Sequence, residues 1–73
     1  MNIENAINKA VKILKDNRIK NPRLDSEILM SKIIKKDRKF IFLNSKKKIE
    51  KKKFEEFKYL IDERSKGKPI AYI

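Results

Sequence analysis

The sequence predicts an all-α fold, a small bundle of four to five helices followed by a short extended segment. Apolar residues recur at intervals of three and four along most of the chain, which is the spacing of one helical face. Residues that commonly begin or end helices separate these stretches, and no stretch before Pro69 alternates as a strand would. With 73 residues, the chain has room for one small core.

The first helix is expected to begin after Asn2, whose side chain can cap it, and to end near Asn17. Its apolar stripe consists of Ile3, Ala6, Ile7, Ala10, Val11 and Leu14. This helix is amphipathic and basic, but its apolar face lacks the Trp and Phe typical of helices that lie on membranes. The stripe is therefore assigned to the core, and no membrane association is expected.

The second helix is expected to have Asn21 as its cap and Pro22 in its first position. Asp25 and Glu27 then lie in the first turns, where the helix dipole favours acidic groups. They are interpreted as helix-start charges, because a metal site would need further oxygen ligands that the sequence does not place nearby. The residues expected to face inward are Leu24, Ile28, Leu29, Ile33 and Ile34, with Met30 alongside.

Two more helices are predicted in the second half of the chain. The apolar cluster from Phe40 to Leu43 favours a short third helix of one or two buried turns. The fourth helix should begin near Glu50 and end at Gly67, which can adopt a positive φ. Its apolar stripe consists of Phe54, Phe57, Leu60 and Ile61. After Pro69 the last four residues favour an extended conformation.

The composition excludes several kinds of site. The chain has no cysteine for disulfides or thiolate metal sites, and no histidine to shuttle protons or bind metals. Its single glycine cannot form a phosphate-binding loop of the Walker or dinucleotide type. We therefore expect no complete active site in this chain. No apolar run approaches the roughly 20 residues needed to cross a bilayer.

The formal net charge of +11 makes nucleic acid a candidate partner. The most basic stretch is KKKIEKKK, from Lys46 to Lys53, and its candidate partner-binding residues are Lys46, Lys47, Lys48, Lys51 and Lys52. The favoured interpretation is a solvated face, because the run contains no arginine and no aromatic side chain for base stacking.

Two other features of the fourth helix bear on its surface. Glu55 and Glu56 are expected to contact Lys51 and Lys52 respectively, four residues earlier. Tyr59 lies off the apolar stripe, so we expect it to be exposed and consider it a candidate partner contact.

Three segments, RLDSEILMSKII, RKFIF and ERSKGKPIAYI, together resemble the N-terminal domain of the HemK/PrmC family. This family consists of methyltransferases that modify the glutamine of the GGQ motif in peptide chain release factors. In the second helix the matching residues are Arg23, Leu24, Asp25, Glu27, Ile28 and Leu29. In the closing segment, which is the more specific, they are Arg64, Gly67, Pro69, Ile70, Ala71, Tyr72 and Ile73.

The resemblance implies how the chain divides into segments and which role each segment has. Residues 1–68 would form a helical substrate-recognition domain, and residues 69–73 would begin a linker to a Rossmann-like catalytic domain that this sequence lacks. In the family, that domain binds S-adenosylmethionine through a glycine-rich motif and holds the target glutamine with an Asn-Pro-Pro-Tyr loop. Neither motif occurs here, so no catalytic, cofactor-binding or metal-binding residue is assigned.

The resemblance also implies the partners. These are the peptide chain release factor and the missing catalytic domain, with Gly67, Pro69, Ile70, Ala71, Tyr72 and Ile73 as the interdomain residues. The chain is expected to be a cytoplasmic monomer. Two other functions stay open: a free-standing basic helical module that binds RNA or DNA, and a purely structural bundle. The apolar closing segment favours the enzyme fragment, because a free-standing module is expected to end on polar residues.

Overall fold

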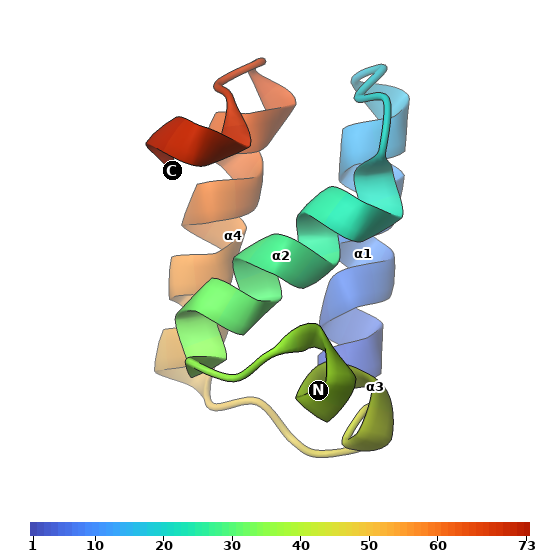
Figure 1. The fold of residues 1–73 in the computed structure, drawn as a ribbon, viewed down its shortest axis with the longest axis vertical. Coiled ribbons are helices and arrows are strands. Elements are labelled where there is room, and N and C mark those ends of the chain that lie inside the picture. Colours follow the sequence, from blue (N-terminus) through green and yellow to red (C-terminus); the bar gives the residue numbers. More distant parts are fainter.

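The computed structural model describes all 73 residues as four α-helices and one turn of 3-10 helix (Figure 1). The elements are α1 (Ile3–Asp16), α2 (Pro22–Ile34), α3 (Arg38–Leu43), α4 (Lys51–Ser65) and η1 (Ile70–Tyr72). There is no sheet, and the only strand-like pairing is an isolated antiparallel bridge between Asn2 and Lys48. The predicted all-α bundle is confirmed.

The helices form a compact arrangement in which α2 crosses the other two long helices. In Figure 1, α1 and α4 run in the same direction at the back, and α2 passes diagonally in front of them. Helix α2 packs against both, and α1 and α4 also pack against each other. The short α3 packs against α2 and lies beside the N-terminus, at the end of the bundle where α1 and α4 begin. No helix is long and apolar enough to cross a membrane.

The core is a single cluster of buried apolar side chains drawn from all four helices. Its members are Ile3, Ala6, Ile7, Ala10 and Leu14 of α1, Leu29 and Met30 of α2, Ile41 of α3, and Phe57 and Ile61 of α4. Helix α1 supplies half of this cluster from the predicted stripe. The amphipathic pattern of α1 is thus the strongest local determinant of the fold.

The helix starts were predicted with mixed success. Asn2 caps α1 in a reciprocal arrangement: its Oδ1 accepts from the backbone N–H of Asn5 (2.7 Å), whose Oδ1 accepts from the N–H of Asn2 (3.4 Å). Asn21 occupies the cap position of α2 but forms no capping hydrogen bond, so Pro22 is the effective start signal there. Glu50 also forms no capping hydrogen bond at α4, as its low cap propensity leads one to expect.

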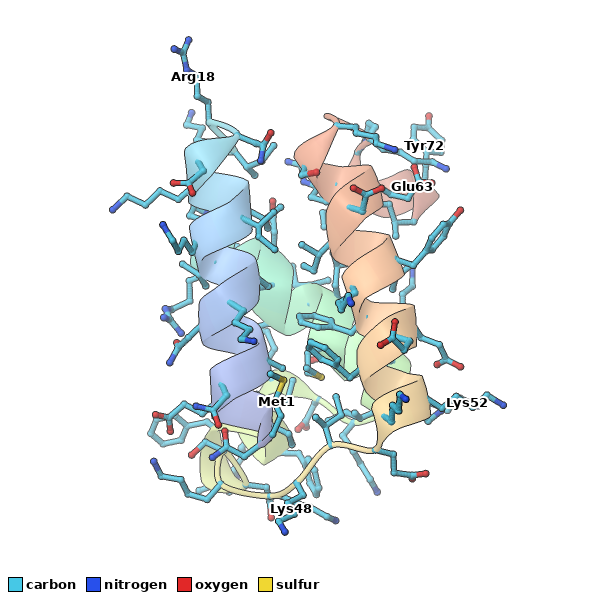
Figure 2. All side chains as sticks on the ribbon, turned by 180° about the vertical axis from the view of Figure 1, so that it is seen from behind. Met1, Arg18, Lys48, Lys52, Glu63 and Tyr72 are labelled. Atoms are coloured by element: carbon cyan, nitrogen blue, oxygen red, sulfur yellow. The ribbon has the colours of Figure 1, made fainter.

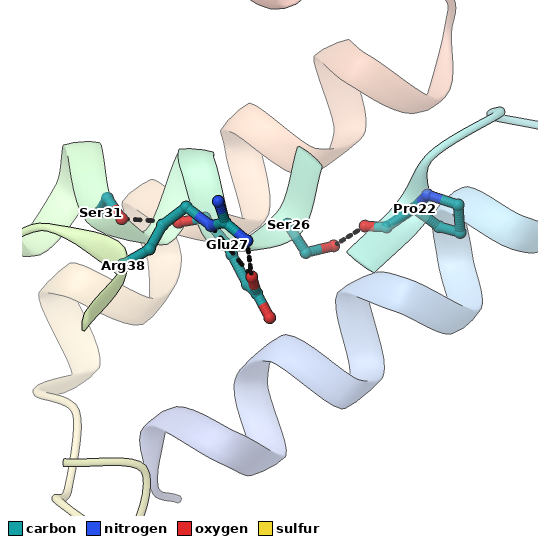
Figure 3. Close-up of polar contacts among 5 residues, drawn as sticks. All are labelled: Pro22, Ser26, Glu27, Ser31 and Arg38. Atoms are coloured by element: carbon teal, nitrogen blue, oxygen red, sulfur yellow. Dashed lines mark hydrogen bonds and ion pairs between the residues drawn. The ribbon is translucent and has the colours of Figure 1, made fainter. Parts of the chain in front are cut away.

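The prediction that Leu24 faces inward is wrong. Leu24 is exposed, and the neighbouring Asp25 and Ser26 are buried instead. Ser26 can be buried because its hydroxyl donates to the Pro22 carbonyl of the same helix at 2.7 Å (Figure 3). This internal hydrogen bond satisfies the polar group where α2 is covered by its neighbours.

The third helix exists but is not buried as predicted. It begins two residues earlier, at Arg38, because Asp37 caps it by accepting from the Phe40 N–H at 2.9 Å. Ile41 is its one buried residue, while Phe42 is 81% exposed and Leu43 is 67% exposed. A six-residue helix packed on one side cannot cover all its apolar residues.

The end of the chain differs from the extended segment that was predicted. Gly67 ends α4 with a φ of 95°, as expected, but residues 70–72 then form the turn η1. Ile70 and Ile73 pack against the core from this turn, and their spacing of three residues suits a 3-10 helix. Burial of these two side chains therefore overrides their preference for extended structure.

Candidate functional site

The largest concave surface lies where α1, α2 and α3 meet and has a volume of about 680 Å³. We call it the α1–α2–α3 groove. Its apolar floor includes the buried residues Ile3, Ile7 and Ile41. Its polar and charged lining consists of Glu4, Asn8, Arg23, Glu27, Arg38, Lys39 and Ser45, and Phe42 completes the wall.

Polar contacts hold the rim of this groove in place. Glu27 Oε1 accepts from Arg38 Nε at 3.1 Å and from Arg38 Nη2 at 3.0 Å, which ties α3 to α2 (Figure 3). Arg23 Nη2 donates to Asn8 Oδ1 at 3.1 Å and ties α2 to α1. Glu27 was predicted to be a helix-start charge, and the structure shows that it is also the partner of Arg38. Contacts within the chain therefore hold both rim arginines in place.

Phe42 gives the groove an exposed aromatic edge, and Leu43 lies next to it in the chain. Nothing in the packing of the bundle requires these two side chains to be apolar. Exposed aromatic residues beside arginines are typical of surfaces that bind proteins. No group of three or more acidic side chains could hold a metal ion.

A second polar cluster links α2 to the end of α4. Asp25 is buried, with its side chain only 10% exposed, and its Oδ2 accepts from Arg64 Nε at 2.9 Å. Arg64 Nη1 also donates to the Lys68 carbonyl at 3.1 Å. Sequence reasoning placed Asp25 in the first turn of α2 correctly but missed its partner. Both residues belong to the segments that carry the family resemblance, which is the signal that could have paired them.

The six predicted interdomain residues lie together at the end of the chain. Beyond Gly67, Pro69 precedes η1, whose Ala71 and Tyr72 are exposed. The ammonium of Lys32 donates to the Ile73 carbonyl at 2.6 Å, so the segment folds back toward α2. Their interdomain role stays a prediction.

The five predicted partner-binding lysines lie at the end of the bundle where α4 begins, where Figure 2 labels Lys48 and Lys52. All five are exposed. Lys46 pairs with Glu4 at 3.1 Å, whereas Lys51 and Lys52 form no ion pair.

The predicted pairs between Lys51 and Glu55 and between Lys52 and Glu56 do not form. Glu55 instead contacts Lys58 at 3.7 Å, and Glu56 contacts Lys53 at 3.9 Å. Both observed pairs are three residues apart, a spacing that also brings helical side chains together.

Tyr59 is 63% exposed, as predicted, but it is not part of the lysine-rich end. Its neighbour along α4 is Glu63, one turn later. Hydrogen bonding with the Glu63 carboxylate, together with the charge of that group, raises the pKa of the Tyr59 phenol above its ordinary value.

Comparison with known proteins supports the family resemblance. Residues 5–73 match the family described as the PrmC N-terminal domain. A protein named release factor glutamine methyltransferase from Buchnera aphidicola subsp. Acyrthosiphon pisum is 37% identical over the whole chain. Proteins of the same name from Buchnera aphidicola subsp. Schizaphis graminum and Clostridium acetobutylicum are 38% and 37% identical, also over the whole chain. The chain spans 26% of the length of each of these three relatives. No solved structure was found to match it.

Proposed function

Because this chain belongs to the PrmC N-terminal domain family, we propose that it is the substrate-recognition domain of a release factor glutamine methyltransferase. The observation that carries this proposal is the match over residues 5–73, together with relatives of that name aligned over the full chain. Its substrate is a peptide chain release factor, whose GGQ glutamine receives the methyl group. This work takes place in the cytoplasm, where release factors act.

In this proposal the chain binds and orients, and the rest of a longer protein performs the chemistry. The catalytic domain binds S-adenosylmethionine, the methyl donor. Residues 69–73 begin the connection between the two domains, and the contacts of Arg64 with Asp25 and with the Lys68 carbonyl set the direction in which the chain leaves α4. A rigid bundle suits such a role, because a preorganised surface loses little conformational entropy on binding.

The α1–α2–α3 groove is the surface that we assign to the release factor. It combines an apolar floor, two positioned arginines and the exposed side chain of Phe42. Leu43, the next residue in α3, is also apolar and exposed. Exposed large apolar residues of this kind become the energetic centre of a protein interface when a partner covers them.

Titration calorimetry of this chain with a peptide chain release factor tests the proposal. We expect saturable binding by the parent chain. A Phe42→Ala, Leu43→Ala variant should bind about tenfold more weakly, since losing interface anchors costs more than about 1 kcal/mol. An Ile13→Ala variant provides the control, because Ile13 is also exposed and apolar but lies outside the groove.

The two possible failures have different meanings. If the parent chain does not bind the release factor, the recognition role itself is wrong. If the parent binds and the double variant binds equally well, the role holds and the groove is the wrong surface. Tyr59→Ala, measured in the same way, tests whether that exposed aromatic residue contacts the partner as its position in the sequence suggested.

A further inference from the structure

A small pocket of about 190 Å³ lies at the end of the bundle where α4 begins, next to the lysine run. Four lysines from three parts of the chain line it: Lys36 after α2, Lys47 and Lys48 between α3 and α4, and Lys53 in α4. We call it the basic pocket. Glu50 is its only acidic residue. Lys36 is a long way from the other three in sequence, so the pocket is a product of the fold.

The positive charge of this pocket is largely unopposed. Lys36, Lys47 and Lys48 form no ion pair, and Lys53 only approaches Glu56, at 3.9 Å. The ammonium groups of Lys36 and Lys47 lie 5.4 Å and 5.5 Å from the centre of the Phe40 ring, so both are drawn to the same aromatic side chain. Like positive charges gathered around one hollow attract anions to it.

One of the four pocket lysines, Lys53, lies in the first turn of α4, where a positive charge opposes the helix dipole. The first turn of α4 consists of Lys51, Lys52 and Lys53 and contains no acidic residue, although the helix dipole favours acids there. Lys53 thus lines the pocket at a position where its charge does not stabilise its own helix.

We propose that the basic pocket binds the phosphate backbone of a nucleic acid without sequence preference. Lysine ammonium groups neutralise phosphates as point charges, whereas protein interfaces are depleted in lysine and enriched in arginine and aromatic residues. The α1–α2–α3 groove is lined by two arginines and one lysine, whereas the basic pocket is lined by four lysines and no arginine. Phe40 is half-buried and lies under two ammonium groups, so it does not offer a free face for base stacking.

Fluorescence anisotropy with a labelled single-stranded RNA of mixed sequence and about 20 nucleotides, longer than one binding site, tests this proposal. Affinity is measured between about 50 and 200 mM salt. Four neutralised phosphates predict that log K falls against log salt with a slope of about −3 for a single strand. A DNA strand of the same sequence should bind equally, because the pocket reads only the backbone.

A triple variant with Lys36→Gln, Lys47→Gln and Lys48→Gln should bind at least tenfold more weakly at low salt, with a slope smaller by about 2. The matched control is Lys9→Gln, Lys15→Gln, Lys20→Gln, which removes the same charge from exposed lysines outside the pocket. The control should keep the slope of the parent. Circular dichroism establishes that both triples fold, and a Lys→Arg triple at positions 36, 47 and 48 should retain binding.

Three results would overturn the proposal. Equal loss of binding in the two glutamine triples would mean that net charge alone attracts RNA. Displacement of the RNA by polyglutamate of equal charge, as effectively as by unlabelled RNA, would assign the pocket to an acidic protein surface. No binding at about 50 mM salt, where phosphate contacts are strongest, would remove the site altogether.

Discussion

The ion pair between Asp25 and Arg64 is the polar contact with the largest expected effect on stability, because it is the least exposed ion pair in the chain. The Asp25 side chain is 10% exposed and that of Arg64 is 20% exposed, so water screens neither charge well. In such a place the pair need not stabilise the fold more than two apolar residues would. Removing one partner is costly, however, because the other charge stays buried without compensation.

We therefore predict that Arg64→Ala lowers the free energy of unfolding by about 3 kcal/mol. Urea denaturation followed by circular dichroism measures this change. Lys66→Ala is the control, because its ion pair with Asp62 (3.1 Å) is exposed and screened by solvent, so its loss should change stability little. Replacing both residues, as Asp25→Leu with Arg64→Met, should recover most of the loss. If Arg64→Ala were as stable as the control, the buried pair would not constrain the fold.

At the scale of elements, the end of α4 depends on one glycine. Gly67 has a φ of 95°, in the region that side chains with a β-carbon avoid. A β-carbon built there would meet no atom within 4 Å, so the cost of a substitution comes from the backbone alone. The position also sets where the closing segment turns back toward the core.

We expect Gly67→Val to destabilise the chain by about 1 to 2 kcal/mol, the usual cost of a left-handed conformation for a residue with a β-carbon. This corresponds to a fall in melting temperature of at least about 4 °C for a domain of this size. Gly67→Asn is the matched control and should lose less, since asparagine tolerates positive φ. A melting temperature unchanged in Gly67→Val would show that α4 can end without this conformation.

The elements also show which parts of the fold can be predicted from sequence. The stripe of α1 and its Asn2 cap were predicted correctly because both are local: spacing and capping act within a few residues. The exposure of Leu24 was missed because α2 is covered on two sides, by α1 and α4, and a single stripe does not describe such a helix. The turn η1 was missed because contacts with the core decide its conformation.

The candidate sites also combine features that local sequence predicts with features that only the folded structure reveals. The lysine run could be located by composition, but the addition of Lys36 to the basic pocket depends on where α2 ends relative to α4. The contact of Arg38 with Glu27 likewise depends on how α3 folds back along α2. Residues that are close only in three dimensions leave no periodic signal in one sequence.

At the scale of the whole molecule, the bundle separates two kinds of surface around one core. The α1–α2–α3 groove has aromatic and arginine side chains, and the basic pocket has lysines. A third concavity of about 380 Å³ lies between α1 and α4 and is lined mainly by apolar residues. None of these resembles a nucleoside cofactor site, which usually pairs a glycine-rich turn with the start of a helix after a strand.

We therefore predict that S-adenosylmethionine does not bind this chain, although the proposed parent enzyme requires it. The single glycine, Gly67, follows a helix, and there is no strand to precede a cofactor-binding turn. In a two-dimensional NMR titration, the amide signals should stay in place as the cofactor is added. The matched titration with a release factor should shift signals from the α1–α2–α3 groove, including Phe42. Saturable shifts with S-adenosylmethionine would instead place part of the cofactor site in the helical domain. Substrate binding and methyl transfer would then no longer be separate tasks of two domains.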